Sequence, residues 1–206
     1  GVINFMGGVG AIISFLVGSQ LYDINQAYPF WLGSALVLLA ALLVFIFIRE
    51  PKVFEENPNA ERPKLLKSLQ EILKEKDKSA IRIFLAIMFW FIAYNAIEAF
   101  FTLFANKHLG MAESEGVRLL TQLSLLFVIF ALPAGLIGGK IGRRKTIATG
   151  IIFLGTCMLL MAVLPVGLLT RLLFTLPVLG EVPVVGLILM AAGIGWSLIN
   201  INSLPM

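Results

Sequence analysis

The sequence predicts an all-α protein, a polytopic transmembrane bundle with six membrane-spanning helices. Hydrophobic residues make up 59% of the 206 residues, and the mean hydropathy is +0.95. Only 14% of the residues are charged, which is about half the share of a soluble domain. This composition excludes a soluble globular protein, because too little polar surface would remain to meet water.

Six segments have the roughly 20 apolar residues that a helix needs to cross a bilayer. The stretch 166–182 is also apolar, but its Arg171, Pro177 and Glu181 indicate an interfacial connection and not a seventh span. The six predicted spans cover residues 1–21, 28–48, 81–104, 117–139, 146–165 and 183–204.

Glycines cluster in the first and last predicted spans. Gly7, Gly8 and Gly10 favour a packing face on the first span, and Gly193 and Gly195 favour close packing or bending of the last. The physical reason is that glycine lets two helix backbones approach closely within a membrane.

A charged segment separates the second span from the third. Residues 49–80 are rich in Lys, Arg, Asp and Glu, and prolines interrupt their first half. After Pro63, apolar residues fall at positions 65, 66, 69, 72 and 73, which predicts an amphipathic helix. We interpret this segment as a solvated linker helix lying on the membrane face, and a specific binding role is the alternative.

Basic residues predict the orientation of the chain. Two spans separate the 49–82 connection from the 140–145 connection, so both lie on the same side of the membrane. Together they hold all but three of the 16 Lys and Arg residues. We therefore expect both connections on the cytoplasmic side. The net positive charge of the chain thus reflects membrane topology and does not indicate a nucleic-acid partner.

The connection GLIGGKIGRRK at 135–145 carries a recognisable spacing. Its glycines permit close helix approach and a tight reversal, and its cations favour cytoplasmic headgroups. The spacing resembles the signature loop of the major facilitator superfamily, except that Gly139 stands where that pattern has an acid. The residues that match the pattern or mark this departure are Gly135, Gly139, Lys140, Gly142, Arg143, Arg144 and Lys145.

The layout of the spans adds to this resemblance. In the family, a long cytoplasmic loop joins two six-helix halves, and the signature loop lies between the second and third helices of each half. The chain is therefore similar to helices five to ten of twelve, as part of a longer protein. The resemblance implies that 1–48 ends the N-terminal bundle, that 49–80 is the central loop, and that 81–206 begins the C-terminal bundle.

Glu98 is the ionisable residue that lies well inside a predicted span. An acid there costs about 2.5–3.5 kcal/mol on insertion scales, so it usually faces a cavity or a partner. Helical spacing places Trp90, Tyr94, Asn95 and Glu98 on one polar-aromatic stripe. Glu98 can exchange a proton, hold Na⁺ or accept hydrogen bonds from solute hydroxyls; alternatively, it bonds to another helix.

A second stripe lies in the last span. Trp196, Asn200 and Ser203 are spaced by four and three residues, which places them on one helix face. In the resembled family this helix and the one that holds Glu98 line the central cavity, so the resemblance implies that both stripes face it. Tryptophan with amides and hydroxyls suits a sugar, and helix–helix hydrogen bonding is the structural alternative.

The chain shows no pattern typical of an enzyme. His108 and Cys157 are the only residues of their types, and no phosphate-binding GxxxxGK[ST] motif occurs. We expect no catalytic residue, no metal site and no cofactor other than a coupling ion.

These patterns and the resemblance together predict a secondary transporter. The YNAIEAFFTLF and GWSLININSLPM stretches look like the sucrose and glycoside–cation symporter branch. We expect a sugar or glycoside coupled to H⁺ or Na⁺, alternating access, and a place in the plasma membrane. The expected partners are the lipid bilayer, a small solute and the remaining helices. A drug or organic-acid transporter, or a non-transporting receptor or scaffold, is the alternative.

Overall fold

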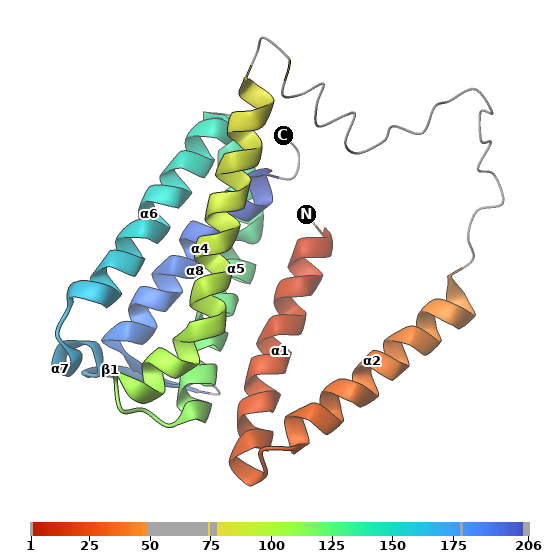
Figure 1. Ribbon diagram of the computed structural model, residues 1–206, viewed down its shortest axis with the longest axis vertical. Helices are drawn as coiled ribbons and strands as arrows, with labels where there is room; N and C mark the ends of the chain where they lie inside the picture. Colours follow the sequence, from red (N-terminus) through yellow and green to blue (C-terminus); the bar gives the residue numbers. More distant parts are fainter. Residues whose placement is uncertain (1, 49–73, 75–77, 178, 204–206) are drawn as a thin grey trace. The chain divides into compact units, whose positions relative to one another are not determined.

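The computed structural model describes residues 2–48, 74, 78–177 and 179–203. In these residues it contains six helices long and apolar enough to span a membrane (Figure 1), and the predicted six-span bundle is confirmed. The spanning helices are α1 (Val2–Ile24), α2 (Tyr28–Phe47), α4 (Ser79–Lys107), α5 (Glu113–Ile141), α6 (Arg143–Val163) and α8 (Val184–Ser203).

Helix α5 begins four residues before the predicted span. The polar residues 113–116 lower the local hydropathy, but they form the first turn of the helix. There the Glu115 carboxylate accepts a hydrogen bond from the Ala112 backbone N–H at 3.0 Å. Glu113 also lies in this first turn, where the helix dipole favours negative charge.

The connection between α6 and α8 forms a short helix and a hairpin. Helix α7 (Val166–Leu169) leads into strands β1 (Leu172–Leu176) and β2 (Gly180–Pro183), which pair antiparallel. This confirms that 166–182 is no seventh span, but the all-α prediction did not include the two strands. Gly180 has a φ of 76° at the start of β2, a conformation that favours glycine.

The chain divides into two compact units. One unit comprises residues 1–31 and 98–206, and the other comprises residues 32–97. Helix α2, most of which lies in the second unit, is almost entirely apolar and buries no residue. An apolar, unburied surface of this kind suits contact with lipid or with further helices.

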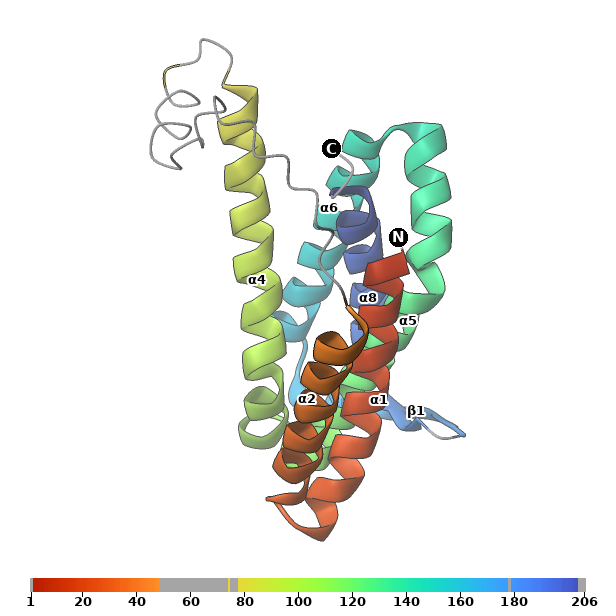
Figure 2. The same cartoon turned by 90° about the vertical axis from the view of Figure 1, so that its right-hand side faces the viewer.

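The core of the first unit is built around α8, which packs against both α5 and α6 (Figure 1, Figure 2). A Cβ atom at Gly193 would overlap the backbone carbonyl oxygen of Leu123 on α5. A Cβ atom at Gly150 on α6 would lie 2.8 Å from the carbonyl oxygen of Gly195. The predicted close packing of Gly193 and Gly195 is therefore confirmed.

Helix α1 packs along α5 in the same unit. A Cβ atom at Gly8 would lie 2.5 Å from Cγ2 of Val128 and 3.1 Å from the ring of Phe127. The predicted glycine packing face is therefore formed by Gly8. Gly7 and Gly10 have nothing within 4 Å of an added Cβ, because they point away from α5.

The predicted amphipathic helix after Pro63 lies outside the described residues. The same holds for almost all of the 49–80 segment. Cys157 is described, and its side chain is buried in α6, as expected for a small hydrophobic residue.

We predict that Gly193→Ala destabilises the bundle. The added methyl group would force α8 away from the α5 backbone, and overpacking of this kind costs roughly 1–3 kcal/mol. The melting temperature of the full-length protein in detergent should fall by roughly 5 °C. Gly155→Ala on α6, where an added Cβ meets nothing within 4 Å, is the matched control. Equal melting temperatures for the two variants would contradict the assigned packing.

Candidate functional site

The polar-aromatic stripe of α4 is only partly buried. Trp90 is 8% exposed and Tyr94 is half-buried, whereas Asn95 and Glu98 are exposed. The Asn95 amide donates to the backbone oxygen of Phe91 at 2.8 Å, which satisfies one donor within its own helix. The two aromatic residues thus lie on the more buried side, and the two polar residues lie beside them.

The Glu98 carboxylate lies within the membrane-length segment of α4. Among the residues that the structure describes, none donates a hydrogen bond to this carboxylate or pairs with it. An acid at this depth usually faces a cavity, a partner or a bound ion. The described part of the chain therefore provides the acid but not its partner.

The last part of α4 packs on the beginning of α5. Phe101 and Ala105 are buried, and a Cβ atom at Gly116 would lie 3.1 Å from Cβ of Ala105. The segment of α4 that begins at Glu98 belongs to the first unit. Glu98, Ala99 and Phe100 are exposed, so the acid itself lies outside this contact.

The stripe on α8 is more buried than the stripe on α4. Trp196 is 5% exposed, and Asn200 and Ser203 are half-buried. The Ser203 hydroxyl donates to the backbone oxygen of Asn200 at 3.0 Å. Because Trp196 is almost fully buried, its predicted role in stacking on a solute would require the surrounding helices to move. The solute role of these three residues stays a prediction.

Asn202, next to this stripe, connects α8 to α5. Its amide nitrogen donates to the backbone oxygen of Ala134 at 3.1 Å and to that of Leu198 at 3.0 Å. A Cβ atom at Gly138 would overlap the side-chain oxygen of Asn202. The asparagine therefore occupies the space that Gly138 leaves open in the first half of the signature loop.

The signature loop is a sharp turn between α5 and α6. Gly142 joins the two helices with a φ of 100°, which confirms the tight reversal expected for glycine. Gly135 lies in ordinary contact with Ile201, and an added Cβ at Gly139 would meet nothing within 4 Å. The four cations of the loop are exposed: Lys140, Arg143, Arg144 and Lys145.

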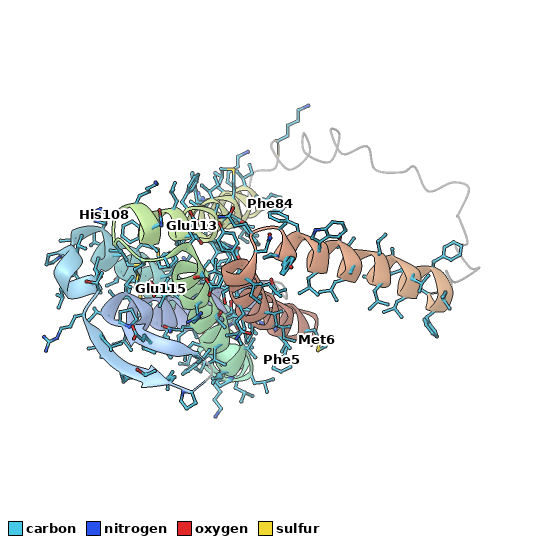
Figure 3. All side chains as sticks on the ribbon, turned by 90° about the horizontal axis from the view of Figure 1, so that it is seen from below. Phe5, Met6, Phe84, His108, Glu113 and Glu115 are labelled. Carbon is cyan, nitrogen blue, oxygen red and sulfur yellow. The ribbon has the colours of Figure 1, made fainter. Side chains whose placement is uncertain are left out.

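Two side-chain pairs join α1 to α5 at the end where α5 begins. The Tyr22 hydroxyl donates to the Glu113 carboxylate, and Arg118 Nη2 lies 3.7 Å from Asp23 Oδ2. Figure 3 views the molecule from this end and labels Glu113 there. Arg118 near the start of α5 is thus paired with Asp23 near the end of α1.

Gln122 connects α5 to the hairpin. Its amide nitrogen donates to the backbone oxygen of Glu181 at 2.9 Å, and the residue is fully buried. In the described part of the chain, the Gln122 side-chain oxygen and the Thr121 hydroxyl have no hydrogen-bond partner.

Sequence reasoning missed the pairing of Asn202 with Gly138 and the two α1–α5 pairs. Each joins positions far apart in the sequence, and neither partner of a pair carries a local signal for the other. The only available signal was compositional, because polar side chains at helix ends or beside small residues commonly bond to a neighbouring helix.

Comparison with protein families finds a model that matches the whole chain. The family model described as the Major Facilitator Superfamily matches the chain over residues 1–206. Searches of curated proteins and of solved structures gave no match.

We predict that Gly138→Ala destabilises the protein and that Gly139→Ala does not. The methyl group at 138 would displace the Asn202 side chain and break its bond to Ala134, whereas position 139 is open. The melting temperature of each full-length variant in detergent measures the difference.

A double variant tests whether the effect arises from this contact. Replacing Asn202 by alanine makes room for the new methyl group, so Gly138→Ala should cost less in that background, as expected for residues in contact. Additive losses in the double variant would show that Asn202 is not the group that Gly138 accommodates.

Proposed function

Because the chain belongs to the major facilitator superfamily of secondary transporters, we propose that it carries a sugar or glycoside across the membrane together with H⁺ or Na⁺. It is an integral multi-pass membrane protein. We also propose that it lies in the plasma membrane. The solute class and the coupling ion are likewise part of the proposal.

The Glu98 carboxylate is the observation on which the proposal rests. It lies inside an apolar helix and has no described protein partner. Burying an unneutralised carboxylate in hydrocarbon is unfavourable, so binding a proton or Na⁺ would change the energy of each conformation. A group with these properties can couple ion movement to a conformational change.

The neighbours of Glu98 support a polyhydroxylated solute. Trp90 and Tyr94 offer aromatic faces that can pack against the C–H faces of a sugar ring. Asn95 is exposed and has an amide that can bond hydroxyl groups. On α8, Asn200 and Ser203 offer further polar groups and Trp196 a second indole ring. These residues form the proposed binding set, with Glu98 holding the ion or the solute.

The proposed mechanism is alternating access. Two helix bundles would rock about a site near the middle of the membrane and expose it to one side at a time. The sharp Gly142 turn and the cations of the signature loop would lie on the cytoplasmic side. Helices outside this chain would complete the site, since Glu98 has no described partner.

Counterflow uptake into proteoliposomes tests transport directly. The full-length protein would be loaded with one unlabelled solute, and entry of labelled sugars, glycosides, organic acids and cationic drugs would be compared. Uptake of a sugar or glycoside supports the proposal. Uptake of only a drug or an organic acid overturns the solute class, and no flux of any solute indicates a receptor or scaffold.

We predict that Glu98→Gln abolishes ion-driven accumulation and leaves solute exchange measurable. The amide keeps the size of the side chain but neither ionises nor neutralises a cation. Accumulation against a gradient and exchange at equal concentrations would both be measured in the same proteoliposomes.

Glu181→Gln serves as the matched control, because Glu181 is exposed on β2 and makes its described bond through its backbone. It should accumulate solute at the wild-type rate. Accumulation at that rate in Glu98→Gln would show that Glu98 does not couple the ion.

A further inference from the structure

We propose that the β1–β2 hairpin anchors the protein in the surface of the lipid bilayer. Strand β1 would place its apolar side chains in the leaflet opposite the signature loop, and Arg171 would bind a lipid phosphate there. The proposed partner is the phospholipid of that leaflet. The proposal does not depend on the solute or on the coupling ion.

The first observation is the level at which the hairpin lies. Helix α6 starts at the signature loop and ends at Val163, and α8 begins at Val184. Both helices are long and apolar enough to span a membrane, so the hairpin that joins them lies at the surface opposite the signature loop. It runs sideways, across the direction of the helices (Figure 2), and it follows the edge of the first unit when seen from below (Figure 3).

The second observation is the contrast between the two strands. On β2, the Val182 side chain is fully buried against the bundle. Residues 172–175 of β1 are all exposed, so β1 is the outer strand. The large apolar side chains in this exposed run are those of Leu172, Leu173 and Phe174. Contact with water disfavours three consecutive apolar side chains, and contact with lipid does not.

The third observation is the pairing register, which gives the hairpin two different faces. Paired residues share a face of a sheet, and successive pairs alternate between the faces. Phe174 and Val182 pair on one face, which is apolar. Thr175 and Glu181 pair on the other face, and both are exposed. The hairpin is therefore amphipathic, as segments that lie in a membrane interface are.

An irregularity adds to the apolar surface of β1. The pairing register shifts between Leu172 and Phe174. A shift of this kind breaks the alternation of side chains and re-aims them. The strand can therefore present neighbouring apolar residues to lipid together.

The apolar surface of the hairpin also continues that of α6 along the chain. Leu159 and Val163 are exposed in the last turns of α6, a helix of membrane-spanning length. Leu168 of α7 is exposed as well, and Leu172 of β1 follows it. Exposed apolar side chains thus extend from the spanning helix into the hairpin, and the same solvent suits both.

The open edge of β1 favours lipid headgroups over a covering helix. Within the described residues the sheet has two strands, so the outer edge of β1 carries backbone groups that no further strand pairs. A membrane-spanning helix bonds its own backbone groups internally and offers none to a strand edge. Headgroups and interfacial water can bond to this edge. The hairpin therefore fits the level of the headgroups.

Arg171 supplies a charge that matches this surface. It directly precedes β1, its side chain is exposed, and none of the described residues forms an ion pair or hydrogen bond with its guanidinium group. Its backbone oxygen accepts a hydrogen bond from the Val184 backbone N–H at 3.0 Å, which holds it at the base of the hairpin. Guanidinium groups bind phosphate through paired N–H donors. A phosphate contact here would fix the depth of β1.

Collisions with paramagnetic reagents test where the hairpin lies. A spin label would be attached to Phe174→Cys in the full-length protein, after replacing Cys157 by serine and removing other cysteines, in phosphatidylcholine vesicles. Oxygen concentrates in lipid and a water-soluble nickel chelate stays outside it, so the ratio of the two collision rates measures depth. We expect this label to lie roughly 5–10 Å into the interface, the depth of interfacial amphipathic segments.

Thr175→Cys is the matched control, because Thr175 is the neighbouring residue on the polar face. Its label should collide mainly with the nickel chelate. Frequent nickel collisions at both positions would show that the hairpin stands in water. Few collisions with either reagent at position 174 would show that protein covers it. Either result overturns the proposal.

Charge reversal tests the phosphate contact. Arg171→Glu replaces attraction to phosphate by repulsion, so the label at position 174 should move toward water and collide more often with nickel. Lys107→Glu makes the same charge change at an exposed cation on the same side of the membrane, and it should leave the depth unchanged. Equal depths in these two variants would overturn the role of Arg171. The labels report depth without any solute, so a failure of counterflow leaves this test intact.

Discussion

The packing of α8 between α5 and α6 is the interaction on which the rest of the first unit depends. Lipid offers no hydrophobic drive between helices, so association relies on close backbone contact and interhelical hydrogen bonds. Gly193 meets the Leu123 carbonyl, and Gly150 and Gly195 meet each other's backbone. Asn202 adds a hydrogen bond from α8 to α5. This three-helix group carries the signature loop at one end and the hairpin near the start of α8.

The contact between α1 and α5 has a different chemical character. It is close at Gly8, but its other end consists of partly exposed polar pairs that water can reach. Close backbone packing resists displacement, whereas exposed polar pairs exchange readily with solvent. The first unit therefore combines a three-helix group joined by close backbone contacts with one helix whose end carries exposed polar pairs.

The candidate site lies where this packing is incomplete. Glu98 is the first residue of α4 that belongs to the first unit, and its carboxylate has no partner among the described residues. The residues around it are partly exposed, while Trp196 on α8 is enclosed. Within the first unit, Glu98 is exposed, whereas Trp196 is almost fully buried. This difference follows from the depth of packing of each helix, and residue type does not reveal it.

The sequence by itself determined the six spans, because about 20 apolar residues cross a membrane as a helix whatever their neighbours are. It also marked Glu98, since a charge in an apolar run is visible without coordinates, and the reversal at Gly142. Only the tertiary structure decided which glycines pack: Gly8 and Gly138 touch a neighbour, while Gly7, Gly10 and Gly139 do not. It alone revealed the hairpin and the bonds made by Asn202, Tyr22 and Arg118. Those features depend on pairing between distant segments, and a pair forms only where the fold brings both partners together.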